Sequence, residues 1–557
     1  MKRALVIQRS KFGDVAQTLP ALSALRQQHP DWEIWVLGRG RYVSLLERFE
    51  GVDRVISTGS DCAAASPEAL ELCAQDIVRQ LPEGQWELVA NLSHDPVAGR
   101  VATLLAARER AGLLVDGKGE RSLAGEAIRY LFGAVGARRL ARIHLSDIYR
   151  WALGVQTEPV AFPLLGEHAE DAESVRAKLA ASGVDLSRKL VLFQLGTAAP
   201  ERRWPVHLFA RLGRMLAAFP DIQIALIGSE EERALGEAYH QLAPGTAADL
   251  IGQIPVQELP ALARLASVLI GADTGPTHIA AAVGSTTIGL YHATAWVHET
   301  GPYGRGHVVL QADLHCSPCF QRTACAEKPC ATSVQPEHVF QALVWKGIVP
   351  EDEVPAEFMN APWTQVRAFV SEMRPTGVLF RQVAGNSAER EEVLAAACRE
   401  GAYRLWFPSS GRGTGDSARA ATGEGASFLL EMKELLELAD LAGQGASFAH
   451  RILRSVRHVS GMGKKLPELA RKLDEVDERI RQLGPGVELI RSYLTESQKL
   501  LSGGNVAAMA AQSEKAYSAA AKWARFAAEW LKQRFSEQED TARVEEKSEQ
   551  EAVAAVQ

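Results

Sequence analysis

A glycine and an aspartate follow the first apolar run of the chain, where a carboxylate could act as a base. Residues 4–8 read as a strand, and Gly13-Asp14 comes just before an apolar-periodic helix. Ligands of doubly wound sheets bind beyond the carboxyl ends of the strands, so this loop should face a crevice. Asp14 could take a proton from an incoming hydroxyl there, or it could simply cap the helix. Arg9 and Lys11 beside it would attract an anionic substrate.

The segment 273–278, Asp-Thr-Gly-Pro-Thr-His, follows a predicted strand at 267–271 and opens another helix. Thr274, Gly275 and Thr277 lie at the mouth of that helix, whose free N–H groups and dipole suit a phosphate. Proline at the fourth position of the segment fits a first helical turn, where no N–H is needed. Gly275 would let a ligand approach the backbone closely. Ordinary helix capping is the alternative explanation.

A third loop supplies a hydroxyl and two guanidinium groups. The predicted strand at 189–194 runs into Gly196-Thr197 and then into Arg202-Arg203-Trp-Pro. Hydroxyl and N–H donors from two strand ends, together with arginine, are what a diphosphate requires. The alternative is that Arg202 and Arg203 are surface residues without a ligand.

Four cysteines lie within fifteen residues, at positions 316, 319, 325 and 330. Four thiolates in a cytosolic loop could hold a structural zinc ion or, less often, an iron–sulfur cluster. Only Cys316 and Cys319 have the familiar two-residue spacing, so reduced or reversibly paired thiols are the other reading. No metal is assigned to these residues.

The elements that must position these groups follow from the apolar pattern. The chain has 557 residues, which suggests roughly three or four domains at ~150 residues each. Over residues 1–345, short apolar runs alternate with helical patterns, which indicates an α/β fold with mainly parallel sheets. Strands are expected at 4–8, 33–37, 88–91, 189–194, 223–227, 267–271 and 287–291, and helices include 16–28 and 206–218.

The pattern restarts near residue 190, so we expect two doubly wound domains, at 1–165 and 166–345. A connector with a small appendage and a flexible linker should occupy 346–427, with the linker at 409–427. Residues 428–535 read as a helical bundle or coiled-coil module. In it Leu466, Leu469, Leu473, Val476, Ile480 and Leu483 form an a/d seam for a partner helix. The acidic tail at 536–557 is expected to be disordered.

Composition narrows the class of protein. Lys plus Arg number 61 against 68 Asp plus Glu, a net charge of −7, which argues against a protein that chiefly binds nucleic acid. No apolar run is long enough for a transmembrane helix. The N-terminal apolar stretch is too short for a secretory signal. We therefore expect a cytoplasmic protein, either soluble or in peripheral contact with the inner face of the cytoplasmic membrane.

Together these residues resemble glycosyltransferase family 9, the heptosyltransferases of lipopolysaccharide core assembly. The motifs that carry the resemblance are Gly13-Asp14 followed by Thr18-Leu-Pro-Ala-Leu; Arg-Arg-Trp-Pro at 202–205; Gly228-Ser-Glu-Glu; Asp273–His278; and Cys316-Ser-Pro-Cys319 through Cys330, followed by Gln335-Pro-Glu-His-Val339. The cysteine segment is most similar to the second heptosyltransferase type. The resemblance covers about 60% of the chain and does not extend to residues 346–557.

The resemblance implies a GT-B fold, two Rossmann-like doubly wound domains facing across a cleft, here with a C-terminal α-helical extension. It implies that Asp14 is the general base and that the second domain binds the donor. The implied donor-binding residues are Thr197, Arg202, Glu230, Asp273, Thr274, Gly275, Thr277 and His278. Arg202 stands where the family usually has lysine, and Glu231 is the alternative to Glu230. The acceptor-side candidates are Arg9, Lys11, Arg108, Arg110 and His144.

The implied activity is inverting, metal-independent transfer of a heptose from ADP-heptose to a lipopolysaccharide inner-core acceptor. No cofactor is required, because the nucleotide sugar is the substrate. One alternative keeps the family and changes the donor sugar or the polysaccharide acceptor. Another is a transferase-like scaffold that recruits partners or self-associates through the helical extension.

Overall fold

The structure is a computed structural model. It describes residues 2–59, 66–156, 159, 162, 164–319, 325, 327–386, 389–406, 429–457, 466–499 and 506–554. These fall into two compact units. Unit 1 comprises residues 1–119 and 143–387, and unit 2 comprises residues 120–142 and 388–557. The expected linker at 409–427 lies outside the described residues.

The first sheet of unit 1 is parallel and has the order β3-β2-β1-β4-β5. Its strands are β1 (Arg3–Gln8), β2 (Glu33–Arg39), β3 (Arg54–Thr58), β4 (Trp86–Asn91) and β5 (Ala107–Val115). The apolar run at 4–7 is fully buried, as expected for a central parallel strand with helices on both faces.

The second sheet has the order β14-β13-β12-β11-β10-β7-β8-β9. Its strands are β7 (Lys189–Gln194), β8 (Ile222–Ile227), β9 (Ala248–Asp249), β10 (Val268–Gly271), β11 (Thr287–Tyr291), β12 (Val308–Ala312), β13 (Val366–Arg374) and β14 (Gly377–Ala384). The strands from β12 to β9 are parallel, and the β13–β14 hairpin is antiparallel. Chain order within the parallel part is that of a doubly wound Rossmann-like sheet.

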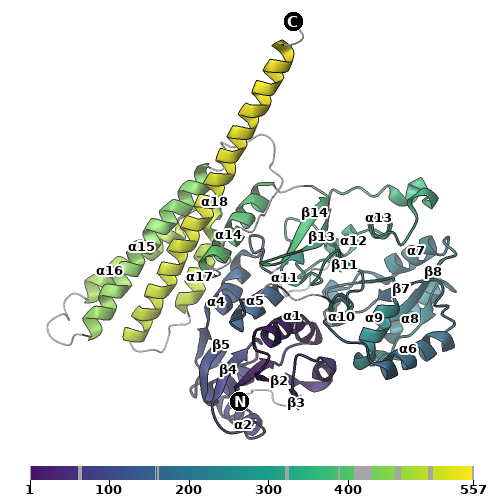
Figure 1. The fold of residues 1–557 in the computed structure, drawn as a ribbon, viewed down its shortest axis with the longest axis horizontal. Coiled ribbons are helices and arrows are strands. Elements are labelled where there is room, and N and C mark those ends of the chain that lie inside the picture. Colours follow the sequence, from purple (N-terminus) through teal and green to yellow (C-terminus); the bar gives the residue numbers. More distant parts are fainter. Residues whose placement is uncertain are drawn as a thin grey trace. The chain divides into compact units, whose positions relative to one another are not determined.

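Helices flank both sheets of unit 1 (Figure 1). They are α1 (Phe12–Gln28), α2 (Pro67–Val78), α3 (Pro96–Leu104), α5 (Leu145–Ala152), α6 (Ala169–Ala181), α7 (Val206–Leu216), α8 (Arg233–Leu242), α9 (Leu259–Leu265), α10 (Gly275–Ala282), α11 (Val297–Thr300), α12 (Pro329–Ser333) and α13 (Pro336–Trp345). The expected α/β fold with two Rossmann-like sheets, a GT-B arrangement, is confirmed, and each of the seven strands named from the sequence is present.

The β13–β14 hairpin lies in the segment expected to be a connector with an appendage. It extends the second sheet past residue 345, because β13 pairs antiparallel with β12 over Val308–Ala312. Residues 428 onward were expected to be helical and then disordered from 536. Helix α18 instead runs from Val506 to Ala554, because alanine, glutamate, glutamine and lysine in the tail favour helix. The domain limits themselves remain predictions.

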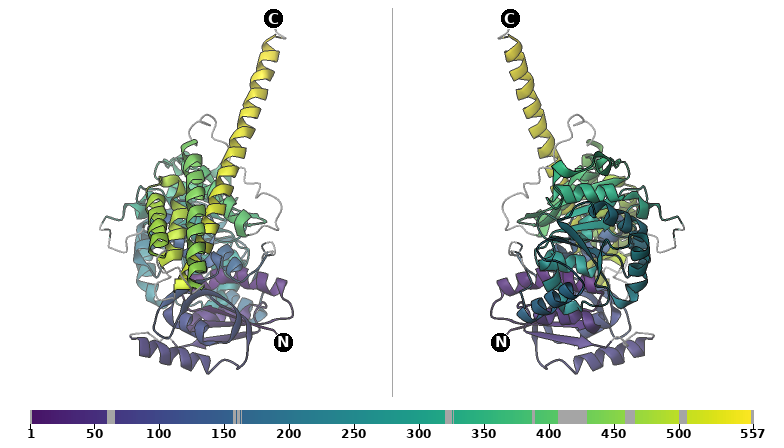
Figure 2. Two further views of the ribbon diagram at one scale, coloured as in Figure 1. Left: turned by 90° about the vertical axis from the view of Figure 1, so that its left-hand side faces the viewer. Right: turned by 90° about the vertical axis from the view of Figure 1, so that its right-hand side faces the viewer.

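The described residues of unit 2 form helices and the short strand β6 (Arg121–Ala124). Its helices are α4 (Glu126–Ala134), α14 (Glu389–Trp406), α15 (Leu429–Arg457), α16 (Leu466–Arg481), α17 (Glu488–Lys499) and α18. Figures 1 and 2 show α15 and α18 running alongside each other. Among the described residues, no helix is long and apolar enough to cross a membrane.

An aromatic cluster holds α4 inside unit 2. Tyr130 of α4 lies edge-on to Trp406 of α14, with ring centroids 5.6 Å apart, and its ring centroid is 5.7 Å from that of Trp523 of α18. The indole N–H of Trp523 donates to the carbonyl of Cys398 at 2.6 Å. A segment of the N-terminal part of the chain is thus a core element of the helical extension.

The apolar seam expected on α16 packs within the chain. Leu469, Val476 and Ile480 are buried, and Leu469 belongs to a cluster with Ile452 of α15 and Ala510 of α18. The partner helices that the heptad spacing predicts are therefore α15 and α18 of the same unit.

Candidate active site

Asp14 lies in the first turn of α1, at the carboxyl end of β1. Its Oδ2 accepts a hydrogen bond from the backbone N–H of Lys11 at 3.2 Å, so the carboxylate also closes a capping box. Burial raises the pKa of Asp14 above its usual value, and the negative charge of Asp273 raises it further. The Lys11 N–H and the imidazoles of His94 and His278 act in the opposite direction. A carboxylate with a raised pKa is a stronger base.

The neighbouring loop after β4 is fixed against the same edge of the sheet. Strands β1 and β4 pair with Ile7 opposite Asn91, so both loops leave the sheet side by side. Arg9, which is 2% exposed, forms an ion pair with Asp95 at 2.9 Å. Arg9 therefore ties two loops together from a buried position, which does not favour its expected role on an acceptor in solvent. Lys11, unlike Arg9, is exposed, and it lies in the loop at the carboxyl end of β1.

Asp273 is the centre of a buried network at the end of β10. Its Oδ2 accepts from Nη1 of Arg202 at 2.8 Å and from the hydroxyl of Thr300 at 3.1 Å. Its Oδ1 is 3.0 Å from Nε2 of His278. Burial alone would raise the pKa of Asp273, but the hydrogen bond and charge of His278, with Arg202 and Thr300, bring it below its usual value. The carboxylate is therefore ionised and fully engaged.

The first turn of α10 offers N–H donors. Thr274 is the N-cap, but its side chain accepts no hydrogen bond from the helix. The hydroxyl of Thr277 donates to the carbonyl of Ala272 at 2.9 Å, and that of Thr274 lies 3.4 Å from the same oxygen. Both hydroxyls are directed to the carbonyl of Ala272, so the Thr274 side chain does not cap the backbone N–H groups at this end of the helix. An anion site at a helix N-terminus requires such uncapped N–H groups.

A small cavity lies beside this network. It is lined by residues of α1 and α10 that include Gln17, Pro20 and His278, and also by Tyr303. In the described part of the chain, Oε1 of Gln17 and Nδ1 of His278 are buried without a hydrogen-bond partner. His278 thus lines this cavity while Nε2 of its ring lies 3.0 Å from Oδ1 of Asp273.

Thr197 and Arg202 come from the loop after β7. Because β7 and β10 pair with Gln194 opposite Gly271, this loop meets the one that carries Asp273. The hydroxyl of Thr197 closes a local turn with Ala199, at 2.9 Å. Arg202 is brought to the site by its ion pair with Asp273.

The loop after β8 places a different carboxylate at the site from the one expected. Glu230 is exposed and forms an ion pair with Arg233 at 2.7 Å. Glu232 instead accepts from the N–H of Ser229 at 2.8 Å and from Nε2 of Gln194 at 3.3 Å. A Cβ on Gly196 would lie 1.7 Å from its Oε1. The S-x-x-E capping box at 229–232 is the sequence signal that could have identified Glu232.

Two acceptor-side candidates, Arg108 and Arg110, do not gather at this edge, whereas His144 lies close enough to Asp273 and His278 to interact with their charges. Arg108 forms an exposed ion pair with Glu87 at 3.0 Å, near the amino end of β5. Arg110 donates to backbone carbonyls of the preceding turn, including that of Leu105 at 2.6 Å. His144 is buried, and burial lowers its pKa to about 3, so it is a neutral N-cap of α5 and not an anion-binding cation.

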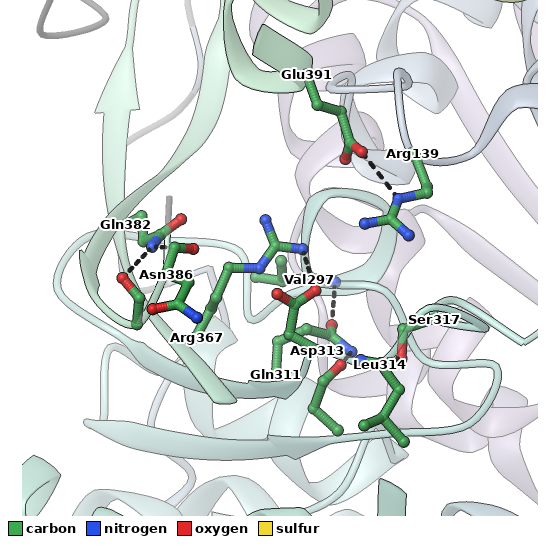
Figure 3. Close-up of polar contacts among 12 residues, drawn as sticks. Arg139, Val297, Gln311, Asp313, Leu314, Ser317, Arg367, Gln382, Asn386 and Glu391 are labelled. Atoms are coloured by element: carbon green, nitrogen blue, oxygen red, sulfur yellow. Dashed lines mark hydrogen bonds and ion pairs between the residues drawn. The ribbon is translucent and has the colours of Figure 1, made fainter. Parts of the chain in front are cut away.

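Strands β12 and β13 support the segment that precedes Thr300, and Figure 3 shows Gln311 of β12 and Arg367 of β13 beside Val297 and Asp313. Oε1 of Gln311 accepts from the N–H of Val297 at 3.1 Å. Arg367 of β13 pairs with Asp313 at 3.0 Å and lies over the ring of Trp296, 5.7 Å from its centroid. These strands thus hold the residues that precede Thr300, and through Thr300 they reach Asp273.

The four cysteines are only partly described, since residues 320–324 and 326 lie outside the described chain. The N–H of Cys319 donates to the carbonyl of Ala293 at 2.8 Å. Burial raises the pKa of Cys330, and Cys316 and Cys325 raise it further. Within the described ranges, no group of three His, Cys, Asp or Glu side chains is arranged to hold a metal ion.

Comparisons with known proteins agree with this geometry. The sequence profile of the family described as Glycosyltransferase family 9 (heptosyltransferase) matches residues 154–330. The chain is 26% identical over 389 residues to lipopolysaccharide heptosyltransferase 1 of Pseudomonas aeruginosa, covering 63% of this chain and 99% of that protein. It is 30% identical over 143 residues to lipooligosaccharide heptosyltransferase 2 of Haemophilus influenzae, covering 25% of this chain and 41% of that protein.

Two solved structures are similar over the same part of the chain. One is a family 9 glycosyltransferase of Veillonella parvula, at 21% identity and a TM-score of 0.49, covering 62% of this chain and 97% of that one. The other is the ADP-heptose heptosyltransferase II of E. coli, at 16% identity and a TM-score of 0.46, covering 64% and 100%.

The Rossmann-like sheets, the polar loops at their carboxyl edges and the sequence comparisons define this protein as a glycosyltransferase of the GT-B type. The chain is similar to glycosyltransferase family 9, whose model matches residues 154–330.

Proposed function

We propose that this enzyme transfers a heptose from ADP-heptose to the inner core of a lipopolysaccharide precursor, with inversion at the anomeric carbon. The observation that carries the proposal is that the loop of Asp14 lies against the Asp273–His278 segment of the other sheet, since a Cβ on Gly13 would lie 3.5 Å from Cδ2 of His278. This proximity supports a base and a donor-binding loop that act together. The relatives named above supply the sugar and the acceptor class.

Asp14 is the general base of the proposed reaction. A hydroxyl oxygen of the acceptor attacks the anomeric carbon of the heptose and forms the new glycosidic bond. Its proton passes to the Asp14 carboxylate, whose raised pKa suits proton abstraction near neutral pH. Attack on the face opposite the leaving group inverts the configuration.

The leaving group is ADP, which departs with the bonding electrons on its β-phosphate oxygen. The N–H groups at the start of α10 are fixed donors for that charge. Arg202 and the hydroxyls of Thr197, Thr274 and Thr277 would complete the diphosphate site. Because these donors are preorganised, the proposed reaction uses no metal ion.

The carboxylate proposed for the ribose hydroxyls is Glu232. It lies at the ends of β7 and β8, where Gly196 and Gly228 both approach it, whereas Glu230 is engaged by Arg233 at an exposed site. We further propose that the enzyme works in the cytoplasm, at the membrane face where such an acceptor is found.

Two measurements test this function. Thermal unfolding with ADP, UDP, GDP and CMP in turn identifies the donor base, since a ligand at ~100 times its dissociation constant adds about 2.7 kcal/mol. A shift with ADP alone supports ADP-heptose. A transfer assay with Asp14→Asn then tests the base, and unchanged transfer would exclude the mechanism.

Other outcomes redirect the proposal. A shift with UDP or GDP would keep the family and the Asp14 mechanism but assign another donor. No shift with any nucleotide, together with no transfer, would favour the scaffold alternative.

A further inference from the structure

An aromatic ring fills the space beside the glycine that opens the donor-binding helix. Phe12 is the first residue of α1 and Gly275 is the first residue of α10. The two helices lie side by side in unit 1 (Figure 1). A Cβ placed on Gly275 would lie 2.0 Å from Cδ1 and 2.5 Å from Cε1 of Phe12. No other residue at 275 fits without displacing this ring.

The next residue along α1 makes only ordinary contact. A Cβ on Gly13 would lie 3.5 Å from Cδ2 of His278 and 3.8 Å from the backbone nitrogen of Gly275. The tight fit is therefore specific to Phe12 and Gly275. Asp14 follows Phe12 by two residues, and Gly275 belongs to the segment that carries Asp273 and His278.

Charge alone would not hold these groups together. Asp14 and Asp273 carry like charges, and the charge of Asp273 adds to burial in raising the pKa of Asp14. An apolar contact does not depend on their protonation state. The ring of Phe12 against the backbone of Gly275 is a contact of this kind, two residues along the chain from each carboxylate.

We propose that Phe12 is a positioning residue. Its ring packs into the space that a side chain at position 275 would fill, and this contact sets the separation between Asp14 and the donor-binding end of α10. The inference rests on the proposed function, because the separation matters only if Asp14 is the base for a donor held there. It also gives Gly275 a second reason to be glycine, apart from close approach of a ligand. In-line attack needs reacting atoms about 3–3.5 Å apart, and a 1 Å misplacement can cost about 10²-fold in rate.

The test is a cycle of Gly275→Ala, Phe12→Ala and the double variant, in the full chain. Gly275→Ala should reduce kcat about 10²-fold, because the new methyl group pushes the ring away. The double variant should recover at least about tenfold of that loss, since the ring it clashed with is gone. If the double variant is no more active than Gly275→Ala, Gly275 serves the ligand alone and the proposal is wrong.

Phe12→Ala by itself separates positioning from donor binding. We expect a fall in kcat with an unchanged dissociation constant for the nucleotide that stabilises the wild-type protein. A folded Phe12→Ala variant with wild-type kcat would overturn the proposal.

Thermal unfolding without ligand gives a readout that does not depend on transfer. Gly275→Ala should lower the unfolding temperature and the double variant should restore part of it. Gly13→Ala is the matched folding control and should not lower it, because its Cβ meets only ordinary contacts. If Gly275→Ala lowers the unfolding temperature and the double variant restores part of it, but no donor is turned over, the packing of Phe12 against Gly275 is supported and the proposed function is wrong. If transfer is measured but these changes in unfolding temperature are absent, the function stands and the contact does not position it.

Discussion

Arg202 and Asp273 form an ion pair of 2.8 Å between Nη1 and Oδ2. The pair joins the loop after β7 to the loop after β10, which leave the sheet side by side because those strands are neighbours. Asp273 is almost fully buried and keeps its charge through this pair, His278 and Thr300. Arg202 can therefore hold a buried carboxylate and still present its remaining donors to a diphosphate.

Replacing Arg202 tests that double role. Arg202→Lys keeps the charge but loses the forked geometry, so we expect up to about tenfold weaker nucleotide binding. Arg202→Met should weaken binding about 10- to 100-fold, the range for a lost charged hydrogen bond of about 1.5–3 kcal/mol. Isothermal titration with the nucleotide that stabilises the protein measures both. Wild-type affinity in Arg202→Met would remove Arg202 from the site.

Asp14→Asn should lose transfer by about 10²- to 10⁴-fold, the usual contribution of a general base. In the wild-type protein, transfer should fall at low pH with a midpoint above the ordinary aspartate value, because burial raises the pKa of Asp14. The pH–rate profile of kcat/KM measures this. A midpoint at or below the ordinary value would contradict the assignment.

The same residue predicts an effect on stability. Because its pKa is raised on folding, the contribution of Asp14 to stability is present below the unfolded pKa and is lost as the pH rises through the folded one. Asparagine carries no charge to bury, so Asp14→Asn should unfold at neutral pH at the same temperature as the wild type or higher. A clear loss of stability would show that the capping box with Lys11 outweighs the cost of the buried charge.

Glu232 and Glu230 form a matched pair of variants. Glu232→Gln should weaken binding of the nucleoside diphosphate because the charge is lost, whereas glutamine keeps the capping hydrogen bond from Ser229 and with it most of the stability. Glu230→Gln breaks only an exposed ion pair, so it should change stability by less than about 1 kcal/mol and leave binding unchanged. Nucleotide titration and urea unfolding decide between them. Weaker binding in Glu230→Gln but not in Glu232→Gln would show that Glu230 is the carboxylate that binds the donor, as the resemblance implies.

The seam of α16 predicts where the stability of unit 2 comes from. Leu469→Ala should destabilise this unit by about 2–5 kcal/mol, as for other buried leucines, and should not change the molecular mass in solution. Lys472→Ala on the exposed side of the same helix should cost no more than about 0.5 kcal/mol. Urea unfolding and sedimentation measure both effects. A lower mass in Leu469→Ala would mean that the seam joins two copies.

The strands that lead into the site could be predicted from the sequence, because the apolar pattern of each strand is contained in a short stretch of residues. Runs such as 4–8 and 189–194 are apolar enough to be recognised alone, and parallel pairing brings the loops that follow them to one edge. Asp14, Asp273 and His278 were found in this way. The repeated α/β pattern also identified two Rossmann-like sheets.

Other features depend on contacts between distant parts of the chain. The β13–β14 hairpin is polar in places, with Arg367 and Ser371 buried, so its apolar pattern is weak until it pairs with β12. The fold decided that Glu232 and not Glu230 reaches Gly196, because the capping spacing at 229–232 predicts where Glu232 turns but not which distant glycine lies beside it. The capture of α4 by the helical extension could not be predicted either, since its aromatic partners lie more than 250 residues away. By itself the sequence determined the fold class and the chemistry of the loops. The tertiary structure decided which side chains meet, because burial and charge pairing are set by neighbours that the local pattern does not contain.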